Sequence, residues 1–549
     1  MAPEAETKAA RDLPPLLVLA VGLAARLALA QGSFLNPDEA LLNLLASQAS
    51  VGLAYRAALT TPHPPLLILA LYYWRWLGQS ELILRLPSVL AGTACSWVAY
   101  QWLKQVSNRS TALTGLLLFT FTPALIELSA EIRQYALVLF FMASCLYLSE
   151  RALRENSWPW MILFSLSLMA ALLTHYSAMI FAFTIGVYML VRLYPYGRRP
   201  LVFAVWMCGQ AAATALCRYF LVTHVAELWQ SGMPRWIADN YLRSSLYHSG
   251  DQRWAVFAAA QTVRLFEYLL ANGVGGVLAL LAFLGGQVVL LSQRQPIHEQ
   301  GPRPRELALL LGLPFLVSCG AALAGLFPYG GTRHDVFLSL FGLSGASFGL
   351  AAWRRPARDW TRPLVIVDCL ALCNFLPMSK LRVRADHASA RMKEAMAAVR
   401  ATVPPGSIIF ADDQSGLLLG YYLCGHGIVQ VFPPPRLFEK SDCGPYTTLT
   451  TPQTWSLRPQ EVPGEVEKLA LAYQLAPGTR IWWFDAGWIG VSALELRQEL
   501  MRRGWTAPRA FGENILLCPL TVGPPGEIRE AGRSESPAAG SAGRRRADK

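Results

Sequence analysis

The chain has 549 residues, of which 53% are hydrophobic and 15% charged, whereas ordinary soluble proteins are roughly one-quarter charged. This composition excludes a typical soluble protein and indicates a membrane protein. The net charge of +12 comes mainly from Lys and Arg between apolar segments and in the C-terminal tail. That distribution is typical of membrane topology, so nucleic acid is not expected as a partner.

Apolar segments of about 20 residues, long enough to cross a bilayer, recur as far as residue 378. The first follows a polar start at 1–11 and has no small-residue cleavage site before the acidic motif that comes next, so we expect it to be retained. The eleven predicted spans are 13–30, 86–103, 111–126, 134–149, 159–174, 178–191, 201–221, 269–291, 307–327, 336–353 and 363–378.

Basic residues lie at every second junction between these spans. Lys and Arg gather before the first span and after the even-numbered ones, which predicts a cytoplasmic N-terminus, because cytoplasmic loops carry excess positive charge. The junctions that would then face outward are 33–85, 127–133, 175–177, 222–268, 328–335 and the chain after the last span. They hold nearly all of the chemically unusual residues, although solvated loops must be polar in any case.

The first outward junction begins with Asn36-Pro37-Asp38-Glu39. Two carboxylates at the membrane surface suit a general base acting on a lipid-borne substrate, but the same residues also make a good helix start. His63 follows in a proline-rich turn, either to position a substrate hydroxyl or as a structural loop histidine. The aromatic run at 71–77 predicts an amphipathic helix in the membrane interface.

Arginines accompany both acidic junctions. Arg26 falls inside the first span, where a cation needs an acid or a lipid phosphate as its partner unless it snorkels outward. At the second junction, Glu127 and Glu131 are spaced to share a helical face. Arg133 beside them suits a phosphate oxygen because its planar fork makes two bonds at once; the alternative is an interfacial salt bridge of little energetic weight.

The composition changes after residue 378 and predicts a second domain. Short β-type runs, with helical stretches between them, indicate a small α/β unit; these runs are 407–410, 428–432, 480–484 and 514–517. The predicted domains are a transmembrane domain at 1–379, an extracytoplasmic α/β domain at 380–525 and a disordered tail at 526–549. Cys424 and Cys443 would be able to pair in an oxidising compartment, but the odd number of cysteines there leaves the pairing open.

Ordered motifs in the first part of the chain carry a family resemblance. They are N-P-D-E-A, T-P-H-P-P-L, S-E-L-I-L-R-L-P-S-V-L-A-G, S-A-E-I-R-Q-Y-A-L and T-H-Y-S-A, with Y-G-G-T-R-H much later. In these motifs the chain resembles the bacterial dolichyl-phosphate-mannose protein mannosyltransferase-like group. These are polytopic glycosyltransferases of the GT-C fold, related to the aminoarabinose transferases of lipid A.

Together with the composition, the resemblance implies a GT-C-like polytopic α-helical membrane protein with about eleven transmembrane helices and a small C-terminal α/β domain outside the cytoplasm. It implies transfer of a sugar from a polyprenyl-phosphate donor to a lipid, glycan or protein acceptor, with inversion, at the periplasmic face of the bacterial inner membrane. The expected catalytic residues are Asp38, Glu39 and Glu131. The residues expected to bind the donor phosphate or the rest of the substrate are Arg26, His63, Arg85, Arg133, Tyr135, His175, Arg333 and His334.

Elementary chemistry agrees with this expectation. Breaking a sugar–phosphate bond passes through an oxocarbenium-like state, so a carboxylate near the acceptor and cations on the departing phosphate both lower the barrier. A W-W-F-D-A-G run at 482–487 is similar to the W-W-D-Y-G signature of oligosaccharyltransferases, but Phe484 interrupts it, so a strand and turn are predicted there.

Three points stay open. The two acidic loops would suit a divalent metal or would work without one. Asp368 and Asn374 in the last predicted span make a transporter or flippase of a lipid-linked or anionic substrate the main rival class, although the chain has no internal repeat of the transporter kind. The sequence does not name the sugar or the acceptor.

Overall fold

The computed structural model of the chain describes residues 2–194, 199–230, 232–239, 241–250, 252–295, 301–353, 369, 388–425, 439–451, 461–486, 509–512 and 515–523. The chain divides into two compact units, Met1–Ser389 and Ala390–Lys549, whereas the change in composition predicts the boundary at 379. The eleventh predicted span, with Asp368 and Asn374, lies outside the described residues, as do the predicted strand at 428–432 and the tail at 526–549.

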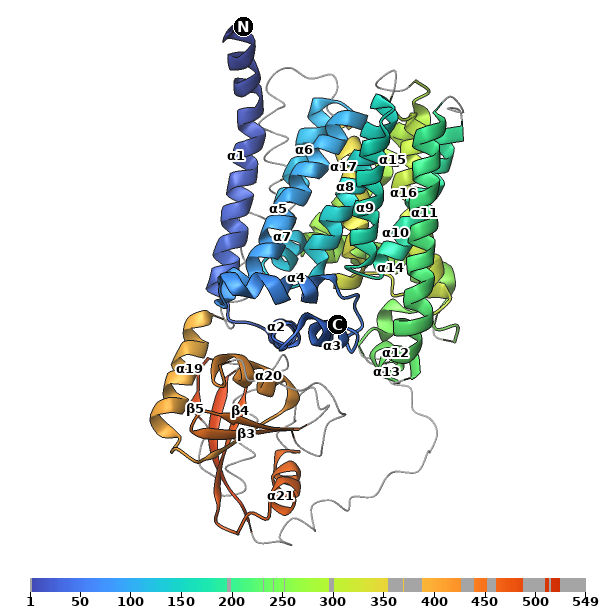
Figure 1. Cartoon of the computed structure of the whole chain (residues 1–549). Coiled ribbons are helices and arrows are strands. Elements are labelled where there is room, and N and C mark those ends of the chain that lie inside the picture. The colour runs from blue at the N-terminus through green and yellow to red at the C-terminus, as the bar shows by residue number, and fades with distance from the viewer. Residues whose placement is uncertain are drawn as a thin grey trace. The chain divides into compact units, whose positions relative to one another are not determined.

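The first unit is a bundle of helices that run side by side (Figure 1). Its long members are α1 (Ala2–Gly32), α5 (Glu81–Val106), α6 (Arg109–Phe121), α8 (Gln134–Glu155), α9 (Trp158–Leu172), α10 (Ser177–Leu193), α11 (Pro200–Phe220), α14 (Trp254–Leu270), α15 (Gly273–Ser292), α16 (Pro304–Leu323) and α17 (Ser339–Trp353). Each of the other ten predicted spans overlaps one of these helices.

Shorter pieces connect them. They are α2 (Pro37–Ala46), α3 (Val51–Ala58), α4 (Leu66–Trp74) with the turn η1 (Arg75–Leu77), α7 (Pro123–Ser129), η3 (Leu221–Val225), α12 (Ala226–Gln230), α13 (Met233–Asp239), η4 (Arg243–Ser245) and η5 (Arg333–Leu338).

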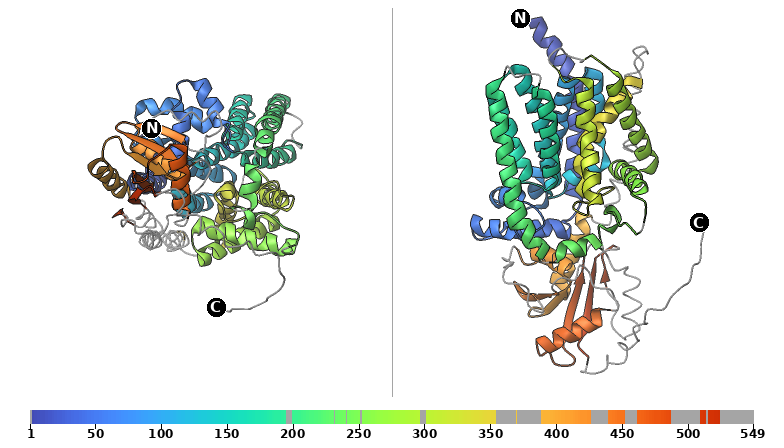
Figure 2. Two further views of the ribbon diagram at one scale, coloured as in Figure 1. Left: turned by 90° about the horizontal axis from the view of Figure 1, so that it is seen from below. Right: turned by 90° about the vertical axis from the view of Figure 1, so that its right-hand side faces the viewer.

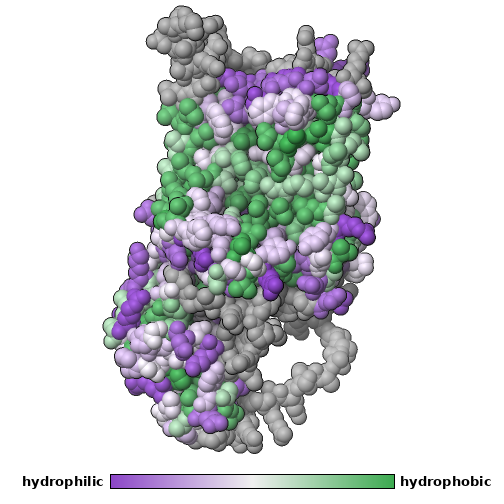
Figure 3. All heavy atoms as spheres, viewed as in Figure 1, coloured by the Kyte–Doolittle hydropathy of each residue, from purple (hydrophilic) through white to green (hydrophobic). Residues whose placement is uncertain are grey.

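Among the described residues, seven helical stretches are long and apolar enough to cross a membrane, and the pair α6–α7, bent by 55°, makes up to eight. The helices α9 and α10 have 15 and 17 residues, slightly short of the usual span. Hydrophobic side chains form a broad band over the bundle on the face shown in Figure 3. The predicted class, a polytopic helical membrane protein, is confirmed.

The connection between α1 and α5 lies across one end of the bundle, where α2, α3 and α4 run transverse to the long helices (Figures 1 and 2). In α4, Ile68 and Leu71 are buried, whereas Trp76 in the following turn is 71% exposed. The helix itself is apolar along its whole length, so the predicted amphipathic character stays a prediction. The indole of Trp74 donates a hydrogen bond to the carbonyl oxygen of Ile83 (2.7 Å), which attaches α4 to the start of α5.

A buried ionic cluster links three helices elsewhere in the bundle. The guanidinium of Arg192 on α10 lies 2.9 Å from Glu150 on α8 and 3.5 Å from Glu306 on α16. The hydroxyl of Tyr188 also donates to Glu150. Because each charge has a partner, burial of this cluster is tolerated, and loss of one member would leave a buried charge unpaired.

The second unit contains a six-stranded sheet of order β2-β3-β1-β4-β6-β5. Its strands are β1 (Ile408–Ala411), β2 (Glu439–Cys443), β3 (Tyr446–Thr450), β4 (Arg480–Asp485), β5 (Arg509–Ala510) and β6 (Leu516–Thr521), and its helices are α19 (Ser389–Thr402), α20 (Asp413–Tyr422) and α21 (Val462–Ala472). The central strands β3, β1 and β4 are parallel, and the outer pairings are antiparallel. Cys424 and Cys443 form a disulfide.

Candidate active site

The motif Asn36-Pro37-Asp38-Glu39 forms the start of α2. Asn36 is the N-cap, and its side-chain oxygen accepts a hydrogen bond from the backbone N–H of Glu39 (2.9 Å). The Glu39 carboxylate in return accepts from the backbone N–H of Asn36 (2.9 Å). This reciprocal capping box turns Glu39 inward, so the two adjacent acids have different surroundings.

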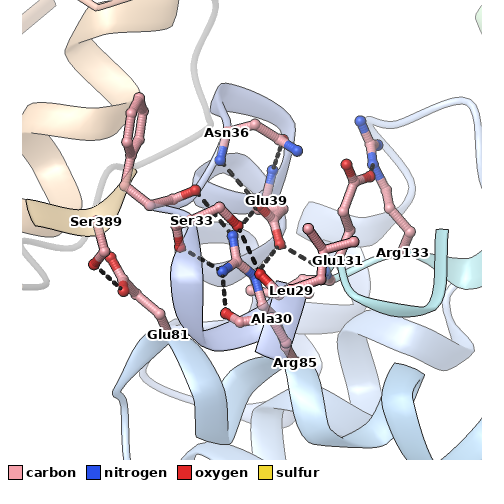
Figure 4. A network of polar contacts seen from close by, with 12 residues as sticks. Leu29, Ala30, Ser33, Asn36, Glu39, Glu81, Arg85, Glu131, Arg133 and Ser389 are labelled. Atoms are coloured by element: carbon pink, nitrogen blue, oxygen red, sulfur yellow. Dashed lines mark hydrogen bonds and ion pairs between the residues drawn. The ribbon is translucent and has the colours of Figure 1, made fainter. Parts of the chain in front are cut away.

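Glu39 and Arg85 form a fully buried ion pair (Figure 4). The guanidinium Nε and Nη2 of Arg85 each lie 2.7 Å from a carboxylate oxygen of Glu39. The same guanidinium donates to the backbone carbonyls of Ala30, Ser33 and Phe34 at 2.6–3.0 Å, and the N–H of Ile132 donates to Glu39 (2.8 Å). The pair therefore connects the end of α1, the start of α2, α5 and the loop before α8.

The electrostatics of Glu39 follow from this arrangement. Burial raises the pKa of its carboxyl, but the Arg85 guanidinium and the backbone N–H donors of Asn36 and Ile132 outweigh burial and hold the pKa below its ordinary value,. Glu39 is therefore an anion at neutral pH. The sequence predicts a catalytic Glu39 and a substrate-binding Arg85, and these roles stay predictions. In the structure the two side chains bond to each other and to the surrounding backbone, which are the contacts of a pair that holds this loop in place.

Asp38 faces the other way and meets two arginines. Its carboxylate pairs with the guanidinium of Arg133, which directly precedes α8, and lies 3.1 Å from Nη1 of Arg333, the first residue of η5. The Asp38 side chain is 29% exposed and that of Arg333 26%. Three junctions far apart in the sequence thus place an accessible carboxylate between two planar cations.

Glu131 belongs to the same group. Its carboxylate lies 4.0 Å from Nε of Arg133, and its side chain is 5% exposed. Burial and the charge of Arg333 lower the pKa of Arg133 to about 9, which leaves it protonated at neutral pH. The two acids and two arginines are formally neutral together, so an arriving anion would compete with the carboxylates for the guanidinium groups.

Three histidines and a tyrosine form a cluster beside Arg333. The rings of His63 and His175 are stacked with centroids 5.5 Å apart, and His175 and His334 are stacked at 6.3 Å. Tyr135, the second residue of α8, lies 5.4 Å from His175 and 6.4 Å from His334. The four predicted residues come from four different segments, and the structure brings them together.

The three stacked histidines, His63, His175 and His334, are uncharged at neutral pH. Burial lowers the pKa of His175 to about 4. Burial, together with the nearby His175 and His334 rings and the Arg333 guanidinium, lowers the pKa of His63 well below its usual range. The Nδ1 of His175 is engaged by Ser177 (2.8 Å). Within the described part of the chain, Nδ1 of His63 and the hydroxyl of Tyr135 are buried without a hydrogen-bond partner, so both can accept a contact from a bound molecule.

Arg26 lies elsewhere, among backbone carbonyls. The helix α6 ends at Phe121 and α7 begins at Pro123, because Pro123 cannot continue the hydrogen-bond ladder. The guanidinium of Arg26 donates to the carbonyls of Thr120 (3.1 Å) and Phe119 (3.4 Å) and to the hydroxyl of Ser129 (2.9 Å). Its contacts are those of a cation at a helix C-terminus, whereas the sequence predicts an acid, a lipid phosphate or substrate as its partner.

Two tyrosines near the arginines were not predicted. Tyr268, at the end of α14, interacts electrostatically with Glu127, Glu131 and Arg333, and its burial raises its pKa well above the ordinary value. Tyr241 interacts with Arg133 and Arg333. Single tyrosines in a long outward junction belong to no motif, and only the fold shows that they are near the site.

The side chains of the site indicate which kind of ligand it suits, a metal ion or an anion. In the described ranges, no group of three or more His, Cys, Asp or Glu residues is arranged to hold a metal ion. The acids instead have arginines as partners, and the stacked imidazoles face one another with their rings. The site as described fits an anionic ligand better than it fits a cation.

Comparisons with known proteins show a similar sequence in part of the chain and a similar fold. Residues 62–222 match the family model of dolichyl-phosphate-mannose-protein mannosyltransferase. The crystal structure of ArnT from Cupriavidus metallidurans bound to undecaprenyl phosphate has 13% identity and a TM-score of 0.53, over 91% of this chain and 97% of that one. The archaeal oligosaccharyltransferase AglB from Archaeoglobus fulgidus, in complex with an inhibitory peptide and a dolichol-phosphate, has 11% identity and a TM-score of 0.46, over 86% and 69%.

None of the curated proteins matches the chain in sequence. The likeness to ArnT shows a shared fold along nearly the whole of both chains. The resemblance and the fold expected from the motifs are thereby confirmed.

Proposed function

We propose that this protein, a mannosyltransferase-like chain of the GT-C fold, is a membrane glycosyltransferase that uses a polyprenyl-phosphate-linked sugar. The observation that carries the proposal is the Asp38 carboxylate placed between Arg133 and Arg333. A carboxylate for the acceptor and two cations for the leaving phosphate are what an inverting sugar transfer needs.

The proposed reaction is a single displacement at the anomeric carbon. The acceptor hydroxyl loses its proton to the Asp38 carboxylate, and its oxygen forms the new bond to the anomeric carbon. The bond from that carbon to the phosphate oxygen breaks, and its electron pair stays on the phosphate. The phosphate changes from a diester with one negative charge to a monoester with up to two, and this growing charge is what Arg133 and Arg333 would stabilise.

Donor binding would also prepare the base. In the structure both arginines pair with Asp38. A donor phosphate offers both guanidinium groups a competing anion with more oxygen atoms. As the arginines turn to the phosphate, Asp38 is released to accept the proton of the acceptor hydroxyl, so the base becomes available only when a donor is present.

The remaining residues take supporting roles. Glu131 would orient Arg133, which lies within 4.0 Å of it. The uncharged His63, His175 and His334, with the Tyr135 hydroxyl, would hydrogen-bond sugar or acceptor hydroxyls without adding charge. We assign Glu39 and Arg85 to holding the loop that carries Asp38, and Arg26 to stabilising the break between α6 and α7.

We place the reaction at the periplasmic face of a bacterial inner membrane. The charge alternation along the chain favours a cytoplasmic N-terminus, which puts the junctions carrying Asp38, Arg133 and Arg333 on the outer side. The second unit then follows on the outer side as well. The acceptor is a lipid, a glycan or a protein at that surface.

The test is reconstitution in proteoliposomes with a panel of polyprenyl-phosphate-linked pentoses and hexoses and with candidate lipid, glycan and peptide acceptors. We expect a sugar-modified product and released polyprenyl phosphate in equal amounts with at least one donor. Movement of the lipid-linked sugar across sealed vesicles without any product would instead favour a flippase or transporter and would overturn the proposal.

A further inference from the structure

The segment that carries Arg333 rests directly on the helix α14. At Gly330, φ is +137°, a backbone conformation that favours glycine,. A Cβ atom at Gly330 would lie 2.1 Å from the side-chain oxygen of Gln261, and a Cβ at Gly331 would lie 2.6 Å from the carbonyl oxygen of Arg264. The two glycines therefore let the backbone lie against α14 with no side chain between them.

Hydrogen bonds hold the same segment in place. The hydroxyl of Tyr329 lies 2.6 Å from the hydroxyl of Thr262 on α14, and Tyr329 is 2% exposed. The backbone N–H of Tyr329 donates to the carbonyl of Ser245 (2.8 Å). Gln261 donates to the carbonyl of Ser244 (2.5 Å). We call this contact of 329–331 with Gln261, Thr262 and the Arg264 carbonyl the α14 seat.

The residues that directly follow the α14 seat, 332–335, belong to the site. Thr332 donates through its hydroxyl to the buried carboxylate of Asp335 (3.1 Å), and the N–H of Asp335 donates to the carbonyl of Thr332 (3.1 Å). These bonds form the first turn of η5. Arg333 lies between them, one residue from Thr332 and 3.1 Å from the Asp38 carboxylate, so any shift of the seat moves its guanidinium.

We propose that Thr262, acting through Tyr329, is a positioning residue that sets how far Arg333 reaches toward Asp38. The inference deepens the proposed function and rests on it, because it assumes that Arg333 acts on the donor phosphate. A displacement of about 1 Å at a reacting group costs up to about 100-fold in rate. Thr262 touches no reacting atom in this account; its effect passes through the seat.

Replacement of the hydroxyl tests this directly. Thr262→Val keeps the shape but removes the bond to Tyr329, together with the bond that the same hydroxyl donates to the Ala258 carbonyl of its own helix (2.7 Å). We expect kcat to fall about tenfold while KM for the acceptor stays the same. Thr262→Ser keeps the hydroxyl and should restore the rate. As a matched control, Thr214→Val removes a bond of the second kind, from a hydroxyl to the Gln210 carbonyl of its own helix, and it should transfer sugar at the wild-type rate.

A double variant shows whether the effect passes through Arg333. If it does, Thr262→Val combined with Arg333→Ala is no slower than Arg333→Ala alone, because the group being positioned is already gone. Losses that multiply in the double variant, or a wild-type rate in Thr262→Val, would overturn the positioning role.

A measurement without substrate separates this inference from the proposed function. Hydrogen–deuterium exchange of the backbone amides at 330–338 should be about tenfold faster in Thr262→Val than in the wild type, and unchanged in Thr262→Ser and Thr214→Val. A wild-type protein that transfers no sugar would overturn the proposed function, and the exchange result would still decide whether Thr262 orders this segment. Unchanged exchange in Thr262→Val would overturn the seat itself.

Discussion

Replacing Glu39 by Gln should destabilise the protein without removing its chemistry. The Glu39 carboxylate accepts two bonds from Arg85, one from the N–H of Asn36 and one from the N–H of Ile132. The amide of Gln has the same shape but only one accepting oxygen, and because each carboxylate oxygen accepts two of these bonds, its NH2 group would meet donors at two of the four contacts. The negative charge that balances Arg85 would also be lost.

The size of the effect follows from burial. Glu39 and Arg85 are both 0% exposed, so solvent does not screen their interaction. Removing one partner of a buried ion pair typically costs about 3–5 kcal/mol. Arg85 keeps its three backbone carbonyl acceptors, which places the expected loss at the lower end, about 3 kcal/mol of unfolding free energy.

The assay is reversible unfolding in mixed detergent–SDS micelles, with transfer measured below the unfolding range. Asp38→Asn is the matched control, because it makes the same chemical change one residue away, on a side chain that is 29% exposed. We expect Glu39→Gln to be the less stable of the two variants and still active; Asp38→Asn should lose less stability, because Asp38 is partly exposed and Arg133 keeps Glu131 nearby. A Glu39→Gln protein with wild-type stability and no transfer would refute this reasoning and give Glu39 a chemical role.

Three further predictions follow from other parts of the structure. Because burial lowers the pKa of His175 from 6.5 to about 4, the unfolded chain takes up a proton at this histidine before the folded protein does. Its contribution to stability is full above about pH 6.5 and falls by about 1.4 kcal/mol per pH unit toward pH 4. The pH slope of unfolding should therefore be shallower by about that amount in His175→Gln, because His63 also has a lowered pKa and still contributes. Arg192→Leu leaves Glu150 buried without its cation, so unfolding should show a loss of about 3–5 kcal/mol, while the folded fraction keeps its transfer rate. Arg133→Lys keeps the charge but loses the planar fork, so transfer should fall about tenfold and binding of polyprenyl phosphate should weaken; an unchanged rate would remove Arg133 from the phosphate site.

The membrane-spanning segments could be predicted because the signal is local. A run of apolar residues is enough to indicate a span, and basic residues beside it indicate its direction. The break between α6 and α7 could not be predicted in this way, because Thr122 and Pro123 lie inside one apolar run. The sequence therefore predicts an acid or a lipid phosphate as the partner of Arg26 unless the side chain snorkels outward, whereas in the structure the broken helix offers it carbonyl oxygens.

For the candidate site, too, the sequence predicts the residue types but not how they are arranged. Asp38 and Glu39 are equivalent in a sequence, and only the capping box and Arg85, 46 residues further along, distinguish them. The stacked histidines come from separate junctions. The sequence therefore predicts that each contacts the substrate, but it does not predict that they contact one another. The hairpin of β2 and β3 was not predicted, because Glu439–Cys443 is polar and has no alternating apolar pattern.

Asp38 is the base of the proposed reaction and the residue that lies between the two arginines. The most direct measurement is the initial rate of sugar transfer by Asp38→Asn in proteoliposomes, with a donor that the wild type uses and with polyprenyl-phosphate binding measured on the same preparation. We predict no transfer above background, with the donor still bound. A rate close to that of the wild type would contradict the proposed mechanism.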